Sequence, residues 1–300
     1  MWIGLGLCSM LFLGVYDLCK KRALRENSVL PTLFVSNLAG CLLLGVVVLM
    51  AWGLPGWAGG EMFRLGALPW GWHAWLAGKA VVVGISWICA FLALKHLPLS
   101  IASPIRASAP AWTLLGALTL FGETPSGLQW MGMGIILLCY VAFSFVGREE
   151  GIRFERNGWV WLMVLATVIG TCSTLLDKFL LHYVGMAAME VLLWYAFYLL
   201  LFFTVLTGVW WWPRRREQPL RWHGAMPCIG LALILADFFY FVGLADEGAL
   251  LVVLSMLRRS SVVISFVGAG LFFGDVNLRQ KGWVLGGILL GVLFILASGV

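Results

Sequence analysis

The sequence predicts an all-α integral membrane protein, and three observations support this. Apolar residues make up 62% of the chain and charged residues 11%, with a mean hydropathy of +0.96, which is far from the composition of an ordinary soluble domain. Apolar runs of about 20 residues, enough to cross a hydrocarbon core, follow one another along nearly the whole chain. These runs are longer than the alternating segments of about 10 residues that form membrane β-barrels. A bundle of about ten transmembrane helices is therefore expected.

The first five runs lie near residues 2–22, 29–52, 72–95, 99–121 and 127–147. The first lacks the basic start and A-x-A-like site of a cleaved signal peptide, so it is expected to stay as a span. The third begins among tryptophans, which are typical of a membrane interface. The fourth carries Arg106 between Pro104 and Pro110, which should loosen that helix.

The second five runs lie near residues 158–181, 187–212, 224–245, 248–273 and 280–299. The seventh ends in three tryptophans, as an interfacial helix end should. The ninth holds the adjacent Arg258 and Arg259, and the tenth holds paired glycines, including Gly287 and Gly291, which are expected to pack this span closely within the monomer. The connections are short, so no room is left for a soluble catalytic domain.

The two halves of the chain repeat one another. The stretch "SPIRASAPAWTLLGALTLFGE" lies over "SMLRRSSVVISFVGAGLFFGD" and matches Arg106 with Arg258. Upstream, a slightly different register lays Trp2 on Trp159. The sequence therefore predicts two five-helix repeats, residues 1–150 and residues 151–300.

An odd number of spans in each half makes the second half enter the membrane in the opposite sense to the first. Such inverted repeats recur among secondary transporters, which bind substrate near the midplane between the halves and rock one half against the other. A duplication can also simply enlarge a bundle. The repeat favours transport by alternating access.

In each half the fourth span ends in glycine and an acidic residue and a glycine-rich fifth span follows, "FGETPSGLQWMGMGIILL" and "FGDVNLRQKGWVLGGILL". With its two halves of five spans, the whole chain resembles the EamA-type members of the drug/metabolite transporter superfamily. The resemblance implies a multi-pass protein of the plasma (inner) membrane whose cavity is lined mainly by the first four spans of each half. It implies a small-molecule substrate and the lipid bilayer as partners, with no nucleic acid, cofactor or metal. Monomer and homodimer both stay open.

Ionisable residues inside the spans are candidates for function, because each charge costs about 2.5 to 3.5 kcal/mol there. At about 1.5 Å per residue, Arg106 and Arg258 both lie near the midplane and should approach one central cavity from opposite halves. Adjacent helical residues point about 100° apart, so one of Arg258 and Arg259 is expected to face the cavity and the other a neighbouring helix. The predicted substrate-binding residues are Arg106, Arg258, Arg259, Lys79, Ser103, Ser255, Tyr16, Asn37, Trp87 and Tyr240.

The arginines have two interpretations. Planar guanidinium groups bind a carboxylate or phosphate bidentately, or they neutralise buried carboxylates and hold the halves together. The deep basic residues outnumber the deep carboxylates Asp237 and Asp17, which favours an anionic substrate. The Arg258-Arg259 pair also resembles the phosphate-binding Lys-Arg pair of plastid triose-phosphate translocators, distant members of the superfamily, and this implies a phosphorylated substrate. Asp237 and Asp17 are the predicted proton-coupling residues.

Other functions stay open. One is an exporter of neutral or zwitterionic amino acids or drugs whose arginines are structural, and another is a membrane-embedded lipid-handling protein. An enzyme is not expected, because the chain has no H-E-x-x-H, G-x-S-x-G or P-loop signature. The seven cysteines have neither C-x-x-C nor Cys/His spacing, so no metal site or disulfide framework is predicted.

Charge predicts an orientation. Basic residues concentrate in the loops after odd-numbered spans, as in "KKRALREN", "GREEGIRFERN", "PRRREQPLRWH" and "DVNLRQK". The positive-inside rule places these loops in the cytoplasm and both termini outside. The family resemblance implies the opposite, with both termini inside.

Overall fold

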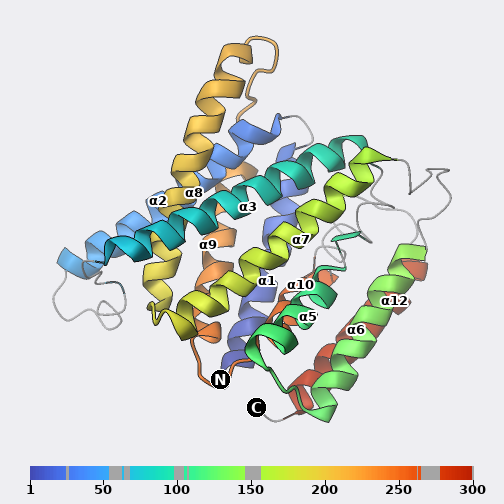
Figure 1. Cartoon of the computed structure of the whole chain (residues 1–300). Helices are drawn as coiled ribbons and strands as arrows, with labels where there is room; N and C mark the ends of the chain where they lie inside the picture. Colours follow the sequence, from blue (N-terminus) through green and yellow to red (C-terminus); the bar gives the residue numbers. More distant parts are fainter. Residues whose placement is uncertain are drawn as a thin grey trace.

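The computed structural model describes residues 1–24, 27–53, 63, 68–97, 105–106, 108–145, 157–261, 263–264 and 278–298. Within these residues every regular element is a helix (Figure 1). The prediction of an all-α membrane protein is confirmed.

The helices follow the predicted runs. In the first half they are α1 (Trp2–Leu24), α2 (Val29–Gly53), α3 (Trp70–His96), α5 (Ala109–Phe121) and α6 (Gly127–Phe145). In the second half they are α7 (Gly158–Lys178) with its π-helical extension η3 (Phe179–Tyr183), α8 (Ala188–Leu206) with η4 (Thr207–Trp211) and η5 (Trp212–Arg214), α9 (Ala225–Leu244), α10 (Leu251–Arg259) and α12 (Leu278–Ala297).

Six helices of the described chain are long and apolar enough to cross a membrane: Trp2–Leu24, Val29–Gly53, Trp70–Ala93, Gly158–Tyr183, Ala188–Arg214 and Ala225–Leu244. Among the other four predicted spans, α5 has 13 residues and α10 has nine, and the described apolar stretches of α6 and α12 are Gly127–Cys139 and Gly286–Ala297. Full membrane crossing by all ten thus stays a prediction.

The most extensive helix contacts come in matched pairs. If each helix is exchanged for its counterpart in the other half, the contact of α1 with α9 becomes the contact of α7 with α3, and both are present. In the same way, the contact of α2 with α9 matches that of α8 with α3, and the contact of α1 with α10 matches that of α7 with α5. Three further contacts, α2 with α8, α5 with α10 and α6 with α12, join a helix to its counterpart in the other half. Two related halves that face each other across a two-fold axis would produce this pattern.

One matched pair of contacts shares its hydrogen bond. The Ser9 hydroxyl on α1 donates to the Ala236 carbonyl on α9 at 2.7 Å. The Ser86 hydroxyl on α3 donates to the Ala166 carbonyl on α7, also at 2.7 Å. The upstream register of the repeat lays Ser9 on Ala166. The two junctions are therefore equivalent, except that the helix that supplies the hydroxyl in one corresponds to the helix that supplies the carbonyl in the other.

Helices α6 and α12 form a separate pair at one flank of the bundle (Figure 1). A Cβ on Gly132 of α6 would lie 2.5 Å from the carbonyl oxygen of Gly291 on α12. Only glycine permits this approach of two backbones. Gly287 and Gly291 of α12 thus pack against α6 within the chain.

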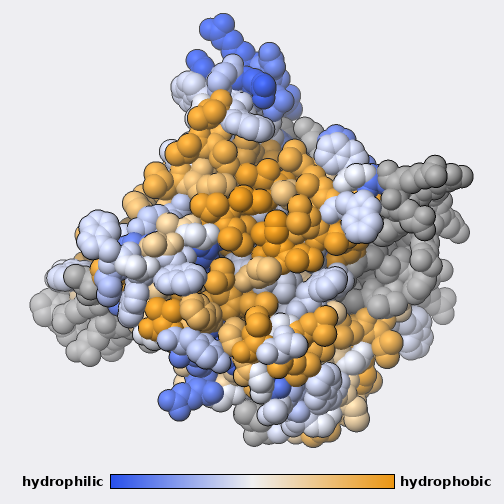
Figure 2. All heavy atoms as spheres, viewed as in Figure 1, coloured by the Kyte–Doolittle hydropathy of each residue, from blue (hydrophilic) through white to orange (hydrophobic). Residues whose placement is uncertain are grey.

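The surface matches a lipid environment. Large apolar side chains are exposed along the outer faces of the helices, among them Leu42, Leu49, Leu138, Val205 and Val209. Figure 2 shows apolar residues over the broad face of the bundle and hydrophilic residues gathered toward its ends. An apolar belt between polar ends is what a multi-pass membrane protein presents to a bilayer.

Candidate functional site

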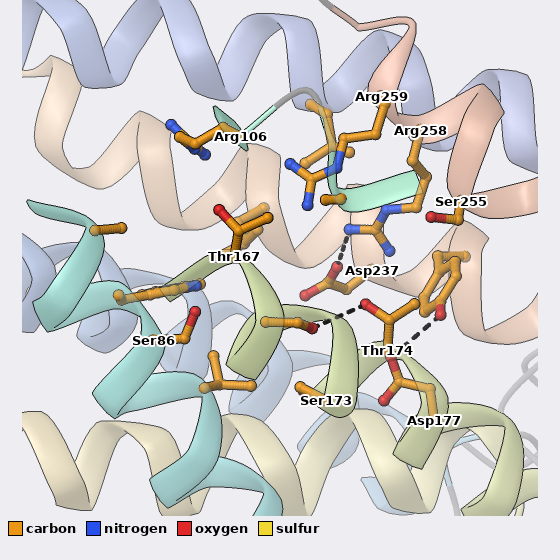
Figure 3. Close-up of a pocket in the computed structure, with 18 of the residues that line it drawn as sticks. Ser86, Arg106, Thr167, Ser173, Thr174, Asp177, Asp237, Ser255, Arg258 and Arg259 are labelled. Atoms are coloured by element: carbon orange, nitrogen blue, oxygen red, sulfur yellow. Dashed lines mark hydrogen bonds and ion pairs between the residues drawn. The ribbon is translucent and has the colours of Figure 1, made fainter. Parts of the chain in front are cut away.

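A cavity of about 250 Å³ lies between the two halves. Helices α1, α3 and α5 and the residue Arg106 line it from the first half, and α7, α8, α9 and α10 line it from the second. Figure 3 shows Arg106, Arg258 and Arg259 along one side, with residues of α3 and α7 across from them.

Most of the predicted site residues meet at this cavity. Those that line it are Tyr16, Asp17, Lys79, Trp87, Arg106, Asp237, Tyr240, Ser255, Arg258 and Arg259. Ser103 lies outside the described residues. The structure does not bring Asn37 to the cavity, because α2 packs against α8 and α9 and the Asn37 amide donates to Leu33 O of its own helix at 2.8 Å.

Both arginines of the adjacent pair line the cavity, which differs from the expectation that only one would. The reason is where the helix ends. Helix α10 stops at Arg259, and Ser260 and Ser261 form a turn, so the pair occupies a last helical turn and not the middle of a long helix. Cations are favoured there, because the last carbonyls carry partial negative charge. In the first half, α5 likewise begins only at Ala109, just after Arg106.

Arg258 is neutralised within its own half. Its Nη2 donates to Asp237 Oδ1 of α9 at 2.7 Å, and the two side chains are 18% and 13% exposed. The guanidinium also lies 4.1 Å from the centre of the Tyr240 ring, a distance that suits a cation–π contact. This geometry matches the pairing interpretation for Arg258.

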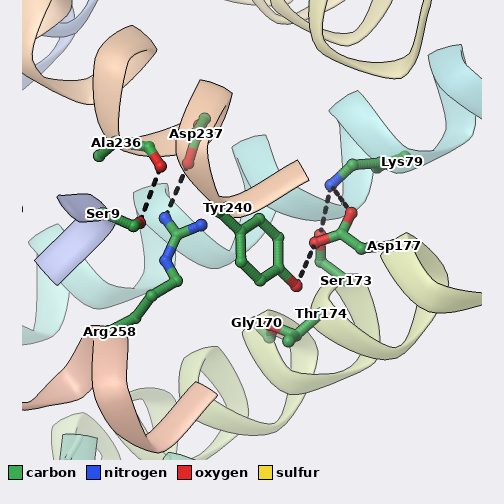
Figure 4. Close-up of polar contacts among 10 residues, drawn as sticks. All are labelled: Ser9, Lys79, Gly170, Ser173, Thr174, Asp177, Ala236, Asp237, Tyr240 and Arg258. Atoms are coloured by element: carbon green, nitrogen blue, oxygen red, sulfur yellow. Dashed lines mark hydrogen bonds and ion pairs between the residues drawn. The ribbon is translucent and has the colours of Figure 1, made fainter. Parts of the chain in front are cut away.

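A second ion pair joins the two halves. Lys79 Nζ of α3 lies 2.6 Å from Asp177 Oδ1 of α7, with side chains 3% and 8% exposed. The opposite charges of the two groups attract each other strongly in this buried, low-dielectric position. Lys79 also donates to the Ser173 hydroxyl at 3.3 Å, and the Tyr240 hydroxyl donates to Asp177 Oδ2 at 3.2 Å (Figure 4).

Asp177 is one of the ionisable residues inside the predicted spans, but it is not among the predicted substrate-binding or proton-coupling residues. A signal for it exists, because polar residues recur every three or four positions along α7 and end at this carboxylate, which places them on one helical face. The hydroxyls of Thr167 and Thr174 on that face donate to Met163 O at 2.9 Å and Gly170 O at 3.2 Å. They therefore offer lone pairs to the cavity.

The numbers of basic and acidic side chains that line the cavity are more nearly equal than the sequence predicts. Four basic and three acidic side chains line the described cavity: Lys79, Arg106, Arg258, Arg259, Asp17, Asp177 and Asp237. Within the described part of the chain Arg106 forms no ion pair or hydrogen bond. One positive charge is left over after pairing.

The first Gly-acidic turn anchors the helix that carries the arginine pair. Gly122 ends α5 with φ of 62°, in the left-handed region. The Glu123 carboxylate then accepts hydrogen bonds from Leu251 N at 2.7 Å, Val252 N at 3.1 Å and Lys178 Nζ at 2.7 Å. A buried carboxylate on the first amides of α10 satisfies donors that the helix itself cannot.

No metal site accompanies these groups, since the described residues contain no cluster of three or more His, Cys, Asp or Glu side chains suited to a metal ion.

Comparison with known proteins gives a family and a fold. Residues 1–145 match the EamA-like transporter family. No curated protein matches the chain. Twenty-eight chains of solved structure match it. One of them, a crystal structure described only as that of a protein, has a TM-score of 0.71 at 15% identity and covers 99% of this chain and 96% of its own.

Proposed function

We propose, from the match of residues 1–145 to the EamA-like transporter family, that the chain carries a small anionic metabolite across the membrane as a secondary-active transporter. The substrate binds in the cavity between the halves, and transport proceeds by alternating access as residues 1–150 and 151–300 rock against each other. The protein is an integral multi-pass membrane protein, and we place it in the plasma membrane.

The matched helix contacts support the alternating-access proposal. Rocking requires two halves that exchange equivalent contacts at opposite faces of the membrane. The junctions of α1 with α9 and of α3 with α7 are equivalent contacts of the two halves, and each contains a serine-to-carbonyl hydrogen bond of 2.7 Å. One junction closes as the other opens.

Arg106 carries the proposal of an anionic substrate. It lines the cavity from the first half and, within the described residues, has no ion pair or hydrogen bond, whereas Asp237 neutralises Arg258. A guanidinium in a low-dielectric cavity binds carboxylate or phosphate as a charge-assisted, bidentate partner. A small carboxylated or phosphorylated metabolite supplies the charge that the cavity lacks.

A zwitterionic substrate is the second candidate. The hydroxyls of Thr167 and Thr174 present lone pairs to the cavity, and these accept hydrogen bonds from an ammonium or hydroxyl group. Its carboxylate would take the place of the anion at Arg106. Both candidate substrates would use the arginines in nearly the same way. The residues of α7 that line the cavity therefore distinguish a zwitterionic substrate from an anionic one.

A ligand screen on the purified protein tests the proposal. Thermal unfolding is followed with phosphorylated, carboxylated, zwitterionic and uncharged metabolites, for the parent and for Arg106→Gln. We expect stabilisation by anions that is lost in the variant, because only a ligand that binds the folded state raises its stability. Stabilisation by uncharged compounds alone, equal in both proteins, contradicts an anionic substrate.

A further inference from the structure

We propose that Asp177 is the group that takes up the coupled proton, and that its ion pair with Lys79 is a latch between the halves that opens on protonation. This inference rests on the proposed transporter function. In this proposal the Lys79–Asp177 contact has two roles: Asp177 binds the proton, and the loss of the ion pair releases α3 from α7.

The pair is placed to act as a latch. It links α3 of the first half to α7 of the second, at one of the two matched junctions. Both partners line the cavity, so a proton from cavity water reaches the carboxylate directly. Besides this pair, the described polar links of the same junction are the hydrogen bonds from Lys79 to the Ser173 hydroxyl and from Ser86 to the Ala166 carbonyl, and both of these acceptors are uncharged.

The position of the ion pair distinguishes Asp177 from Asp237. Asp237 is paired with Arg258. That pair lies within one half, between α9 and α10, so breaking it does not separate the halves. Asp177 is paired with a lysine across the halves, and loss of its charge removes the attraction between them.

The remaining charged and titratable groups around Asp177 come from three other helices. They are Tyr195 of α8, Tyr240 and Asp237 of α9, and Arg258 of α10. Tyr240 donates a hydrogen bond to Asp177 Oδ2, whereas Lys79 pairs with Oδ1. The Tyr240 hydroxyl can still hydrogen-bond to Asp177 after protonation, because a hydroxyl can also accept a hydrogen bond from a carboxylic acid. Lys178, the next residue of α7, pairs with Glu123 instead.

The charges balance only if an anion enters with the proton. Asp177 accepts one proton and becomes a neutral carboxylic acid, while Lys79 keeps its own. The net charge of the pair rises from zero to one positive, in a cavity that already holds a surplus cation. A bound anion offsets this charge, so proton and anion are expected to move together, in the same direction.

Infrared difference spectroscopy detects the protonated carboxyl group directly. The purified full-length protein, in lipid nanodiscs, is compared between about pH 5.5 and pH 9, where exposed carboxylates with pKa values near 4 stay ionised. We expect the carbonyl absorption of a carboxylic acid at the acidic end in the parent and in Asp237→Asn. It should be absent in Asp177→Asn.

Asp177→Asn leaves Lys79 buried without its counter-charge, so Lys79→Gln/Asp177→Asn is the second variant. It removes both charges, keeps two hydrogen-bonding amides, and should also lack the absorption. Loss of the absorption in Asp237→Asn, its retention in either Asp177 variant, or its absence from the folded parent over the whole range overturns the assignment.

Amide hydrogen exchange tests the latch. At pH 8, on the alkaline side of the proposed protonation, exchange near residue 79 of α3 and residue 177 of α7 should be faster in Asp177→Asn than in the parent, and unchanged in Asp237→Asn. Equal exchange in all three proteins refutes the latch. The infrared and hydrogen-exchange measurements use no substrate, so a negative result in either would contradict the latch without contradicting the transporter proposal. A negative ligand screen would contradict the proposed substrate and would not change the interpretation of these two measurements.

Discussion

Lys79 Nζ and Asp177 Oδ1, 98 positions apart in the sequence, lie 2.6 Å from each other in a contact that is almost closed to solvent. This pair joins the two halves of the protein beside the cavity in which we propose that the substrate binds. Its burial makes each partner dependent on the other, because an unpaired charge in a low-dielectric interior is costly.

Removing one partner of this pair should cost far more than removing both. Lys79→Met strands the Asp177 carboxylate and should lower stability by about 3 to 5 kcal/mol. Lys79→Met/Asp177→Leu replaces the pair by apolar groups and should stay within about 1 to 2 kcal/mol of the parent, since the desolvation cost of both charges is also removed. Chemical unfolding in detergent measures this, and equal losses in the single and double variants contradict it.

Arg106→Gln should weaken binding of the anion found in the ligand screen by about ten- to a hundredfold, because one charge-assisted contact is worth about 1.5 to 3 kcal/mol. Arg106→Lys should recover only part of the affinity, since lysine offers a point charge in place of a planar fork. Titration calorimetry measures both, with Arg215→Gln as control, an exposed arginine far along the sequence. Equal loss in the control and in Arg106→Gln would mean that the effect is nonspecific.

Glu123→Gln should destabilise the protein, because the charge that holds the first amides of α10 and Lys178 is lost. Hydrogen bonds to a charged group are worth about 1.5 to 3 kcal/mol, so a drop of this order is expected. The matched control is Glu217→Gln, at an exposed position. A melting temperature equal to that of the control excludes the anchoring role.

Asp237→Asn separates two assignments of the coupled proton. If Asp237 carries it, as the sequence predicted, uptake into proteoliposomes loses its pH dependence in this variant. If Asp177 carries it, the pH dependence persists and anion affinity rises, because Arg258 loses the carboxylate that lies 2.7 Å away. The measurement is initial uptake against external pH, in parent and variant side by side.

A reversible cross-link between α3 and α7 should stop transport. A Cβ on Gly170 would lie 3.1 Å from Ser86 Oγ, and disulfides join Cβ atoms about 3.5 to 4.5 Å apart. Ser86→Cys/Gly170→Cys, with the native cysteines replaced, should lose uptake on oxidation and regain it on reduction. The two single-cysteine variants are the controls. Undiminished uptake by protein shown to be fully cross-linked rules out movement at this junction.

Much of the architecture could be predicted because it depends on runs of consecutive residues. Apolar runs of span length determine that the chain is helical and membrane-embedded, whatever their neighbours are. The rarity of charge inside these runs makes each charged residue informative, and Arg106, Arg258 and Lys79, which the sequence singles out for this reason, all line the cavity. Internal similarity predicts two related halves, and the helix contacts of the structure come in matched pairs.

The tertiary structure decided what depends on partners distant in the chain. Only packing could show that α10 ends at Arg259, that α2 keeps Asn37 from the cavity, and that Glu123 caps a helix 128 positions away. The same holds for Asp177, which became part of the site because Lys79 lies opposite it. Hydropathy reports the cost of burying a charge, whereas the position of the counter-charge that offsets this cost is set by how the helices pack.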